Sequence, residues 1–378
     1  MDFDLSTEQE QIRALARDFC DREVAPGATA RDRAEAFPDD LLPKLFEVGF
    51  LAAPIPEQYG GMGTDYLSYG LIVEELGRTD ASIRSLVSVN TGLVALSILR
   101  WGTEEQRAEW LPRLAGEGLG AFGLTEPDAG SDPSSLRASA RRDGGDWVLN
   151  GTKQFITNGS RGLVTMVFAR ADEGITCFLV PQDADGYEGQ PIKGKLGLRA
   201  GDTSAITLSD VRVPDSARLG ELGKGLKVAL NALDSGRFSL AAGSTGIAQA
   251  ALDAALRYAG EREQFGRPIA RYQLVQELIA DIFLDVEAAR ALYWKVAWRH
   301  DRGERHTIES SVAKTFCSEA AVRCADRAVQ VHGGYGYIDE YPVGRYLRDA
   351  RVTTLYEGTS QIQRLLLGRH LTGENAFT

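Results

Sequence analysis

The chain has 378 residues, of which 43% are hydrophobic and 25% charged, so it is long enough for two or three domains with sizeable cores. Its formal net charge of −11 argues against nucleic acid or an anionic membrane surface as a main partner. No apolar run reaches the ~18 residues that span a bilayer, the acidic N-terminus does not resemble a signal peptide, and the four cysteines have no zinc-site spacing. We therefore expect a cytoplasmic protein with reduced thiols, no membrane segment and no metal site.

Residues 1–119 are predicted to form an N-terminal α-helical domain. The first helix begins near a Ser-Thr-Glu sequence, and its apolar residues Ile12, Leu15, Ala16 and Phe19 recur at spacings of three and four. Further helices are expected over residues 38–48, 66–77, 81–100 and 104–115. Loops rich in proline and glycine separate them.

Residues 120–224 are predicted to form a middle β-domain, because short β-branched or alternating runs are separated there by Gly, Asp and Pro turns. Strands are expected over residues 120–124, 146–149, 164–169, 175–180 and 205–213. No long helical pattern lies between these runs, which disfavours a parallel doubly wound sheet. A small barrel or sandwich is the expected architecture.

Residues 225–378 return to long helices with apolar faces on more than one side, which is typical of helices that pack against other helices or a second subunit. Helices are expected over residues 226–260, 273–300, 308–332, 342–351 and 361–369. The predicted fold is therefore α+β and multidomain: an N-terminal α-helical domain, a middle β-barrel or sandwich, and a C-terminal four-helix bundle.

One carboxylate near the C-terminus stands between an aromatic ring and a glycine, in the order Tyr356, Glu357, Gly358. Thr359 follows and can cap the next helix, so Glu357 lies just before a helix start. Two interpretations are open on these residues alone. Glu357 is either an ordinary first-turn glutamate that complements the helix dipole, or a carboxylate whose apolar surroundings raise its proton affinity and make it a general base.

The common nucleotide-binding signatures are absent, since no GxGxxG sequence follows a strand and no P-loop is present. Four other segments stand out: residues 122–132, 151–159, 262–266 and 330–337. Together with the turn around Glu357, they have the order and spacing of a known family. Over nearly its whole length the sequence resembles the acyl-CoA dehydrogenase family of flavoproteins.

The resemblance implies the three-domain fold of that family and one FAD per subunit. The residues that match its FAD contacts are Phe122, Leu124, Thr125, Phe155, Thr157, Arg262, Gln264, Phe265, Gln273, Gln330, Gly333, Gly334, Thr359 and Gln361. By the same resemblance, the segments around Arg262 and Gln330 reach the FAD of a neighbouring subunit in a homotetramer, a dimer of dimers. Arginines and backbone N–H groups suit a pyrophosphate, and an aromatic wall suits a flavin.

Glu357 matches the family's catalytic base, which removes the α-proton of an acyl thioester while the β-hydrogen leaves as hydride to flavin N5. The product is a trans-2-enoyl thioester. Some relatives place this base near residues 235–236, where this chain has serine and glycine, so no carboxylate competes with Glu357 there. The residues that match substrate contacts are Ser131, Arg84, Ser88, Asp234, Arg237, Tyr356 and Gly358. Arg237 is expected either to meet a CoA phosphate or to pair with Asp234.

The acyl group is left open by the sequence. Arg84 and Ser88 lie four residues apart on one predicted helix face, as in glutaryl-CoA dehydrogenase, which suggests a dicarboxylic acyl group and possible decarboxylation. The alternative environment for Arg84 is a surface ion pair with a nearby carboxylate. The segment after Ser360 instead resembles straight-chain and short-branched enzymes of fatty acid or amino acid catabolism. The acyl carrier, CoA or a carrier protein, is also open.

The partners implied by the resemblance are an acyl-CoA or acyl-carrier-protein substrate and an electron-transfer flavoprotein as electron acceptor. A flavin oxidase on the same fold is one alternative. The larger acyl-CoA oxidases have an extra C-terminal domain that this sequence does not show. A non-catalytic binding protein is a second alternative, and it is disfavoured because Glu357 and Arg262 are both present.

Overall fold

Helices form the first part of the chain, and strands begin only at Gly120. The computed structural model describes residues 3–377. The α-helices of this part are α1 (Thr7–Phe19), α2 (Ala28–Ala34), α3 (Leu42–Glu47), α4 (Tyr66–Thr79), α5 (Ala81–Val87), α6 (Leu96–Trp101) and α7 (Glu104–Gly116). Ser6 caps α1 with a capping box completed by Gln9, which satisfies two of the free backbone N–H groups at the helix start.

The single helix expected over residues 81–100 is interrupted in the structure. A π-helical stretch, Ser88–Ala95, separates α5 from α6. Within it the buried Asn90 side chain donates to the Leu51 and Leu114 carbonyls at 3.0 and 3.2 Å and accepts from the Gly120 N–H at 2.7 Å. Asn90 thus ties this helix to the turn at Leu51, to helix α7 and to the first strand, which a sequence pattern cannot show.

The same stretch corrects the expectation that no run is apolar enough to span a bilayer. By length and composition, Ala81–Trp101 passes that test, and it alone does so among residues 3–377. In the fold, however, 89% of its most apolar window is buried inside the protein. A buried core helix passes the same test, so the finding is weak evidence for a membrane segment.

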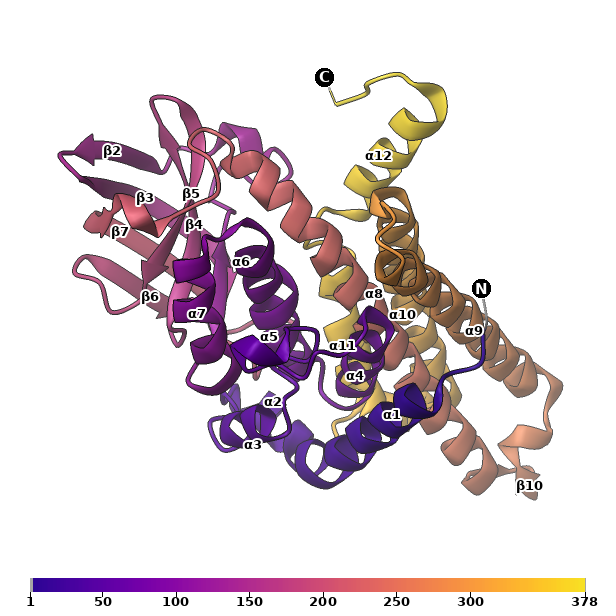
Figure 1. Cartoon of the computed structure of the whole chain (residues 1–378). Helices are drawn as coiled ribbons and strands as arrows, with labels where there is room; N and C mark the ends of the chain where they lie inside the picture. The colour runs from indigo at the N-terminus through magenta and orange to yellow at the C-terminus, as the bar shows by residue number, and fades with distance from the viewer. Residues whose placement is uncertain (1–2, 378) are drawn as a thin grey trace.

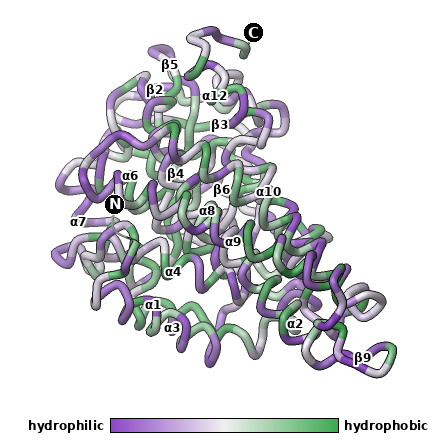
Figure 2. Tube along the Cα trace, turned by 90° about the vertical axis from the view of Figure 1, so that its right-hand side faces the viewer, coloured by the Kyte–Doolittle hydropathy of each residue, from purple (hydrophilic) through white to green (hydrophobic). Residues whose placement is uncertain are grey.

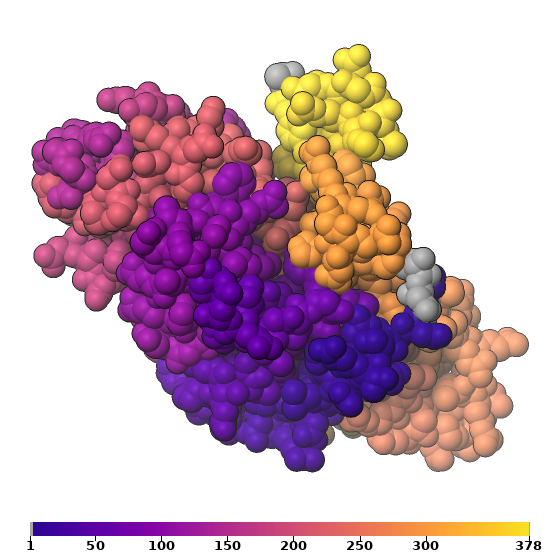
Figure 3. Space-filling model, viewed as in Figure 1, coloured from indigo at the N-terminus to yellow at the C-terminus, as the bar shows by residue number. Residues whose placement is uncertain are grey.

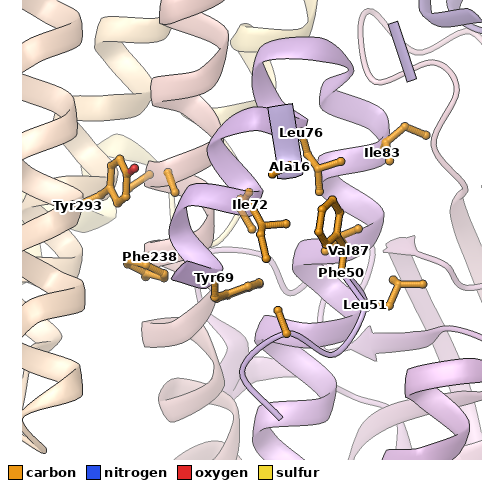
Figure 4. Packing of buried hydrophobic residues seen from close by; sticks show 14 of the residues in the cluster. Ala16, Phe50, Leu51, Tyr69, Ile72, Leu76, Ile83, Val87, Phe238 and Tyr293 are labelled. Atoms are coloured by element: carbon orange, nitrogen blue, oxygen red, sulfur yellow. The ribbon is translucent and has the colours of Figure 1, made fainter. Parts of the chain in front are cut away.

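A hydrophobic cluster joins the N-terminal helices to the C-terminal ones (Figure 4). Tyr69, Ile72 and Leu76 of α4 lie between Phe50 on one side and Phe238 and Tyr293 on the other. All of these side chains are fully buried. The N-terminal and C-terminal helices therefore share one core.

The middle of the chain forms a sheet at one end of the molecule (Figure 1). Its strands are β1 (Gly120–Gly123), β2 (Ser139–Asp143), β3 (Asp146–Thr157), β4 (Val164–Ala171), β5 (Gly174–Pro181), β6 (Tyr187–Pro191), β7 (Thr203–Pro214) and β8 (Arg218–Leu219). Their order is β6-β7-β3-β2-β4-β5-β8, and β1 pairs in parallel with β4. The sequence did not predict β2, β6 or β8, because they are short and lack an alternating apolar pattern.

Long helices resume at Gly225. They are α8 (Gly225–Glu261), α9 (Gln273–Asp301), α10 (Thr307–His332), α11 (Val343–Thr353) and α12 (Ser360–Thr372). A small hairpin, β9 (Glu263–Gln264) and β10 (Arg267–Pro268), lies between α8 and α9. Helix α8 runs from the sheet through the middle of the molecule, where it packs on α4, α9 and α10 (Figure 1). Hydrophobic and hydrophilic residues alternate along the helices, as their packing requires (Figure 2). The predicted fold class is confirmed.

Candidate active site

A cavity of about 1550 Å³ lies between the sheet, helix α8 and the segment that leads into α12. Figure 3 shows the corresponding hollow between the sheet and the C-terminal helix. The cavity brings together many of the predicted site residues: Phe122, Leu124, Thr125, Ser131, Phe155, Thr157, Asp234, Arg237, Tyr356, Glu357 and Gly358. This volume exceeds the roughly 300–1,000 Å³ of a single small-molecule pocket, so two ligands can share it.

Glu357 lies in a tight turn between α11 and α12. Its φ angle is +55° and that of Gly358 is +89°, so both residues have a left-handed backbone. The left-handed region favours glycine, and a glutamate there is held by its surroundings. The Thr359 hydroxyl caps α12 by accepting the Ile362 N–H at 3.2 Å, which fixes where the turn ends.

The Glu357 carboxylate rests against the backbone of α8. A Cβ atom added to Gly236 would lie 2.5 Å from Oε2 and 2.9 Å from Cδ of Glu357. Within residues 3–377, the buried Oε2 atom has no hydrogen-bond partner. Burial raises the pKa of Glu357 from 4.5 to about 7, and the positive charges of Arg84, Lys314 and Arg237 oppose this rise. A carboxyl group with this proton affinity can act as a base at neutral pH.

Arg237 and Asp234, on the same turn of α8 as Gly236, form an ion pair at 3.0 Å. Asp234 also accepts a hydrogen bond from Thr307 at 2.8 Å. The expected pair of Arg237 with Asp234 is therefore present. Its Nε atom also donates to the Glu357 carbonyl at 3.4 Å, which links the pair to the turn.

Arg84 and Ser88 do not line the cavity, although both are buried next to it. Arg84 is 1% exposed and donates a hydrogen bond to the Tyr356 hydroxyl, so the expected alternative of a surface ion pair is wrong. In the part of the chain that the structure describes, Arg84 Nε and Ser88 Oγ have no hydrogen-bond partner. Tyr356 lines the cavity and separates Arg84 from it.

The sheet side of the cavity is an aromatic and hydroxyl-bearing wall. Phe155 has a φ of +61° and is 65% exposed although it lines the cavity, and its strand β3 has a register shift at this point. A bulky residue held in this strained conformation, with its ring open to a cavity, is a typical feature of a ligand wall. With Phe122 and the hydroxyls of Thr125 and Thr157, it supplies the flat apolar contact and few polar groups that a flavin ring needs.

A buried ion pair fixes the loop beside this wall. Lys153 Nζ lies 2.8 Å from Glu126 Oε1 and donates to the Phe168 carbonyl at 2.6 Å. Glu126 also accepts the N–H groups of Arg137 and Ala138 at 2.6 and 2.9 Å. Both ends of the loop that carries Ser131 are thereby anchored to the sheet.

The remaining predicted FAD contacts lie outside the cavity. Gln361 is exposed on α12, and Thr359 serves as the helix cap. A second, exposed group consists of Arg262, Gln264, Phe265, Gln273, Gln330, Gly333 and Gly334. The guanidinium of Arg262 lies over the ring of Tyr335 at 5.5 Å, so the hairpin after α8 meets the turn after α10. We call this group the hairpin cluster.

Sequence reasoning missed three residues of the site. Gly236 makes room for the carboxylate, while Lys314 on α10 and Gln363 on α12 donate hydrogen bonds to the turn carbonyls. A signal was present for Lys314, since a lysine on the alanine-rich, buried face of a helix needs a polar partner. The sequence holds no indication of which partner that is.

A buried carboxylate of raised proton affinity, facing a cavity with room for a planar cofactor and a substrate, suits an enzyme that removes a proton from a bound molecule. Comparison with known proteins identifies the family. Residues 6–117, 121–211 and 223–372 match the families described as acyl-CoA dehydrogenase N-terminal, middle and C-terminal domains. The chain belongs to the acyl-CoA dehydrogenase family and is an oxidoreductase that acts on a CH–CH bond.

Individual relatives agree over almost the full length. The mitochondrial short-chain specific acyl-CoA dehydrogenase of Mus musculus is 42% identical, over 97% of this chain and 91% of that protein. A glutaryl-CoA dehydrogenase of Mycobacterium smegmatis, solved in complex with FADH2, is 38% identical with a TM-score of 0.96, covering 99% of this chain and 97% of that one. A chain from the structure of the electron transferring flavoprotein of Acidaminococcus fermentans is 40% identical, with a TM-score of 0.97 and coverage of 99% and 100%.

Proposed function

We propose that this protein oxidises a short-chain acyl-CoA to the trans-2-enoyl thioester, with FAD as cofactor and Glu357 as the base. The single observation that carries the role of Glu357 is its buried carboxylate, packed on Gly236 and facing the cavity. The short-chain relative supports the substrate class. The Acidaminococcus relative supports an electron-transfer flavoprotein as the acceptor.

The chain's own residues define the acid–base part of the reaction. The Glu357 carboxylate, ionised above pH 7, takes the α-proton of the bound thioester. The main-chain N–H of Glu357 is the donor that polarises the thioester carbonyl and stabilises the enolate-like charge that develops on it. FAD, when bound, accepts the β-hydrogen with its electron pair. Phe122, Thr125, Phe155 and Thr157 would hold its ring on the sheet side of the cavity.

The proposal is tested by Glu357→Gln, which keeps the shape of the side chain and removes the base. We expect the variant to retain FAD and fold, with a loss of at least about 100-fold in turnover of butyryl-CoA. Bleaching of the flavin absorbance under anaerobic conditions measures the reaction. Glu47→Gln, an exposed position on α3, is the matched control. Near-normal bleaching by Glu357→Gln would refute the assignment of the base.

A dicarboxylic acyl group is a second candidate, favoured by one observation. The buried Arg84 and Ser88 side chains, one helical turn apart, keep Nε and Oγ without a hydrogen-bond partner within residues 3–377. The glutaryl-CoA dehydrogenase relative supports this candidate. Access to Arg84 requires that Tyr356, to whose hydroxyl it donates, moves aside.

The two substrate classes are separated by a panel of acyl thioesters. We expect butyryl-CoA to reduce the flavin faster than glutaryl-CoA in the wild type. In a dicarboxylate-specific enzyme, Arg84→Ala would slow glutaryl-CoA far more than butyryl-CoA, because only the former has a carboxylate for it to bind. An equal loss on both would exclude the dicarboxylate. The same panel, with the acyl group on CoA or on a carrier protein, tests the carrier.

We further propose a homotetramer in which the hairpin cluster contacts the FAD of a neighbouring subunit. Its support is that seven residues matching FAD contacts are exposed and stand apart from the cavity of their own chain. Sedimentation analysis with and without FAD, on the wild type and Arg262→Ala, tests this assembly. A cytoplasmic location is likewise proposed, supported by four free, buried cysteines.

A further inference from the structure

The turn that presents Glu357 is held by side chains from three helices. Two consecutive left-handed residues, Glu357 and Gly358, turn their carbonyl oxygens away from the backbone ladder of α12. Gln363 Nε2 donates to the Glu357 carbonyl at 3.1 Å and to the Gly358 carbonyl at 3.3 Å. Arg237 Nε donates to the former at 3.4 Å, and Lys314 Nζ donates to the latter at 2.8 Å. The shortest of these bonds comes from Lys314.

Lys314 is an unusual residue for its position. It is 0% exposed and lies on α10 beside the buried Ala313 and Cys317. A buried ammonium group is costly unless an anion or several acceptors compensate it. Among residues 3–377, Lys314 forms no ion pair, so the Gly358 carbonyl and the fields of the Glu357 and Glu319 carboxylates are what stabilise its charge.

Charged and titratable groups from four helices surround Glu357 and Lys314. The titratable or charged groups that face it or Lys314 are Tyr69 on α4, Arg84 on α5, Asp234 and Arg237 on α8, Glu319 on α10, and the adjacent Tyr356. Arg237 is compensated by its own partner Asp234. Arg84 and Lys314 are the two cations near Glu357 that have no carboxylate ion-pair partner of their own in the described part of the chain, and their field acts on Glu357 together with that of Arg237.

We propose that Lys314 is a positioning residue of the dehydrogenation: its ammonium group holds the Gly358 carbonyl in place, and its charge keeps Glu357 ionised near neutral pH. This inference rests on the proposed role of Glu357 as the base. Lys314 is not among the residues that line the cavity. It acts only through the turn and through the carboxylate.

The two parts of this role predict different behaviour in three variants. Lys314→Met removes both the bond and the charge, whereas Lys314→Arg keeps a charge. Gln363→Leu removes two bonds to the same carbonyls without changing any charge. Because a nearby cation stabilises the carboxylate, its loss raises the pH at which Glu357 ionises, and activity rises only at higher pH.

The first measurement is the pH profile of kcat/KM for butyryl-CoA. For Lys314→Met we expect the midpoint of the rise to move up by roughly one pH unit. Lys314→Arg should return it toward the wild-type value, and Gln363→Leu should lower kcat without moving it. A uniform loss across all pH values in Lys314→Met would overturn the inference, because a purely structural residue gives that result.

The second measurement needs no turnover. Difference infrared spectroscopy follows the carboxyl band of Glu357 with pH in the resting protein, and its absence in Glu357→Gln identifies the band. The band should titrate at higher pH in Lys314→Met. An unchanged titration refutes the role of Lys314, even when Glu357→Gln is inactive as proposed. If Lys314→Met does not fold, Lys314→Gln carries the test, since its amide can still donate to Gly358. Failure of both variants to fold would identify Lys314 as a structural residue and overturn the inference.

Discussion

Substitution of Gly236 by alanine should lower the catalytic activity of this protein and leave its stability nearly unchanged. The residue lies in the interior of α8 and its missing side chain leaves the space that the Glu357 carboxylate occupies. An alanine Cβ would come within 2.5 Å of Oε2, 2.9 Å of Cδ and 2.7 Å of the Leu93 Cδ2 atom. Carbon–oxygen contacts need more than about 3 Å, so the carboxylate must move by roughly 1 Å.

The size of the effect follows from these distances. A displacement of about 1 Å at a reacting group costs on the order of 100-fold in rate, equivalent to about 2.7 kcal/mol. The helix itself gains, because alanine is about 1 kcal/mol more favourable than glycine in a helix interior. The carboxylate is the end of a rotatable side chain and can shift without unfolding its surroundings. We therefore expect a folded, FAD-containing variant with a nearly unchanged melting temperature and a large loss of kcat/KM.

The assay is steady-state oxidation of butyryl-CoA together with a thermal melt monitored by flavin fluorescence. Gly260→Ala is the matched control, since the same substitution in the same helix meets no atom within 4 Å. The control should keep full activity. If Gly236→Ala also kept full activity, the carboxylate position at the surface of α8 would not be the one that reacts.

Two further predictions concern stability. Burial raises the pKa of Glu357 from 4.5 to about 7, so the folded state binds this proton more tightly than the unfolded chain. The contribution of the bound proton to the free energy of unfolding is therefore fully present below pH 4.5 and is lost as the pH rises through 7. Glu357→Gln should therefore be more stable than the wild type by about 3 kcal/mol at pH 8 and nearly equal to it at pH 4.5, as measured by urea unfolding; a constant difference at both pH values would contradict this. Lys153→Met should lower the free energy of unfolding by about 3–5 kcal/mol, because Glu126 stays buried with its charge uncompensated, and it should loosen FAD. Unchanged melting and retained flavin would show that the pair does not anchor the wall.

The sequence alone was sufficient for the order and type of the long elements. The apolar periodicity of α4, α8, α9 and α10 extends over many turns, so these helices can be predicted without knowledge of how they pack. It was insufficient where tertiary contacts override local preference. A π-helical stretch interrupts the helix expected over residues 81–100, and within it Asn90 bonds to Leu51 and Leu114, which are distant in the sequence.

The same division holds for the site. Local sequence was enough to place a carboxylate before a helix start and to show that residues 235–236 carry no rival base. The environment of that carboxylate depends on residues 43 to 121 positions away from it, since Lys314 and Gly236 reach it only through the packing of α10 and α8. Burial, which raises the pKa of Glu357, is a property of that packing. The position of Glu357 before a helix start could therefore be predicted from the sequence. Its raised pKa is decided by the tertiary structure, because the burial that causes it comes from the packing of α8 and α10.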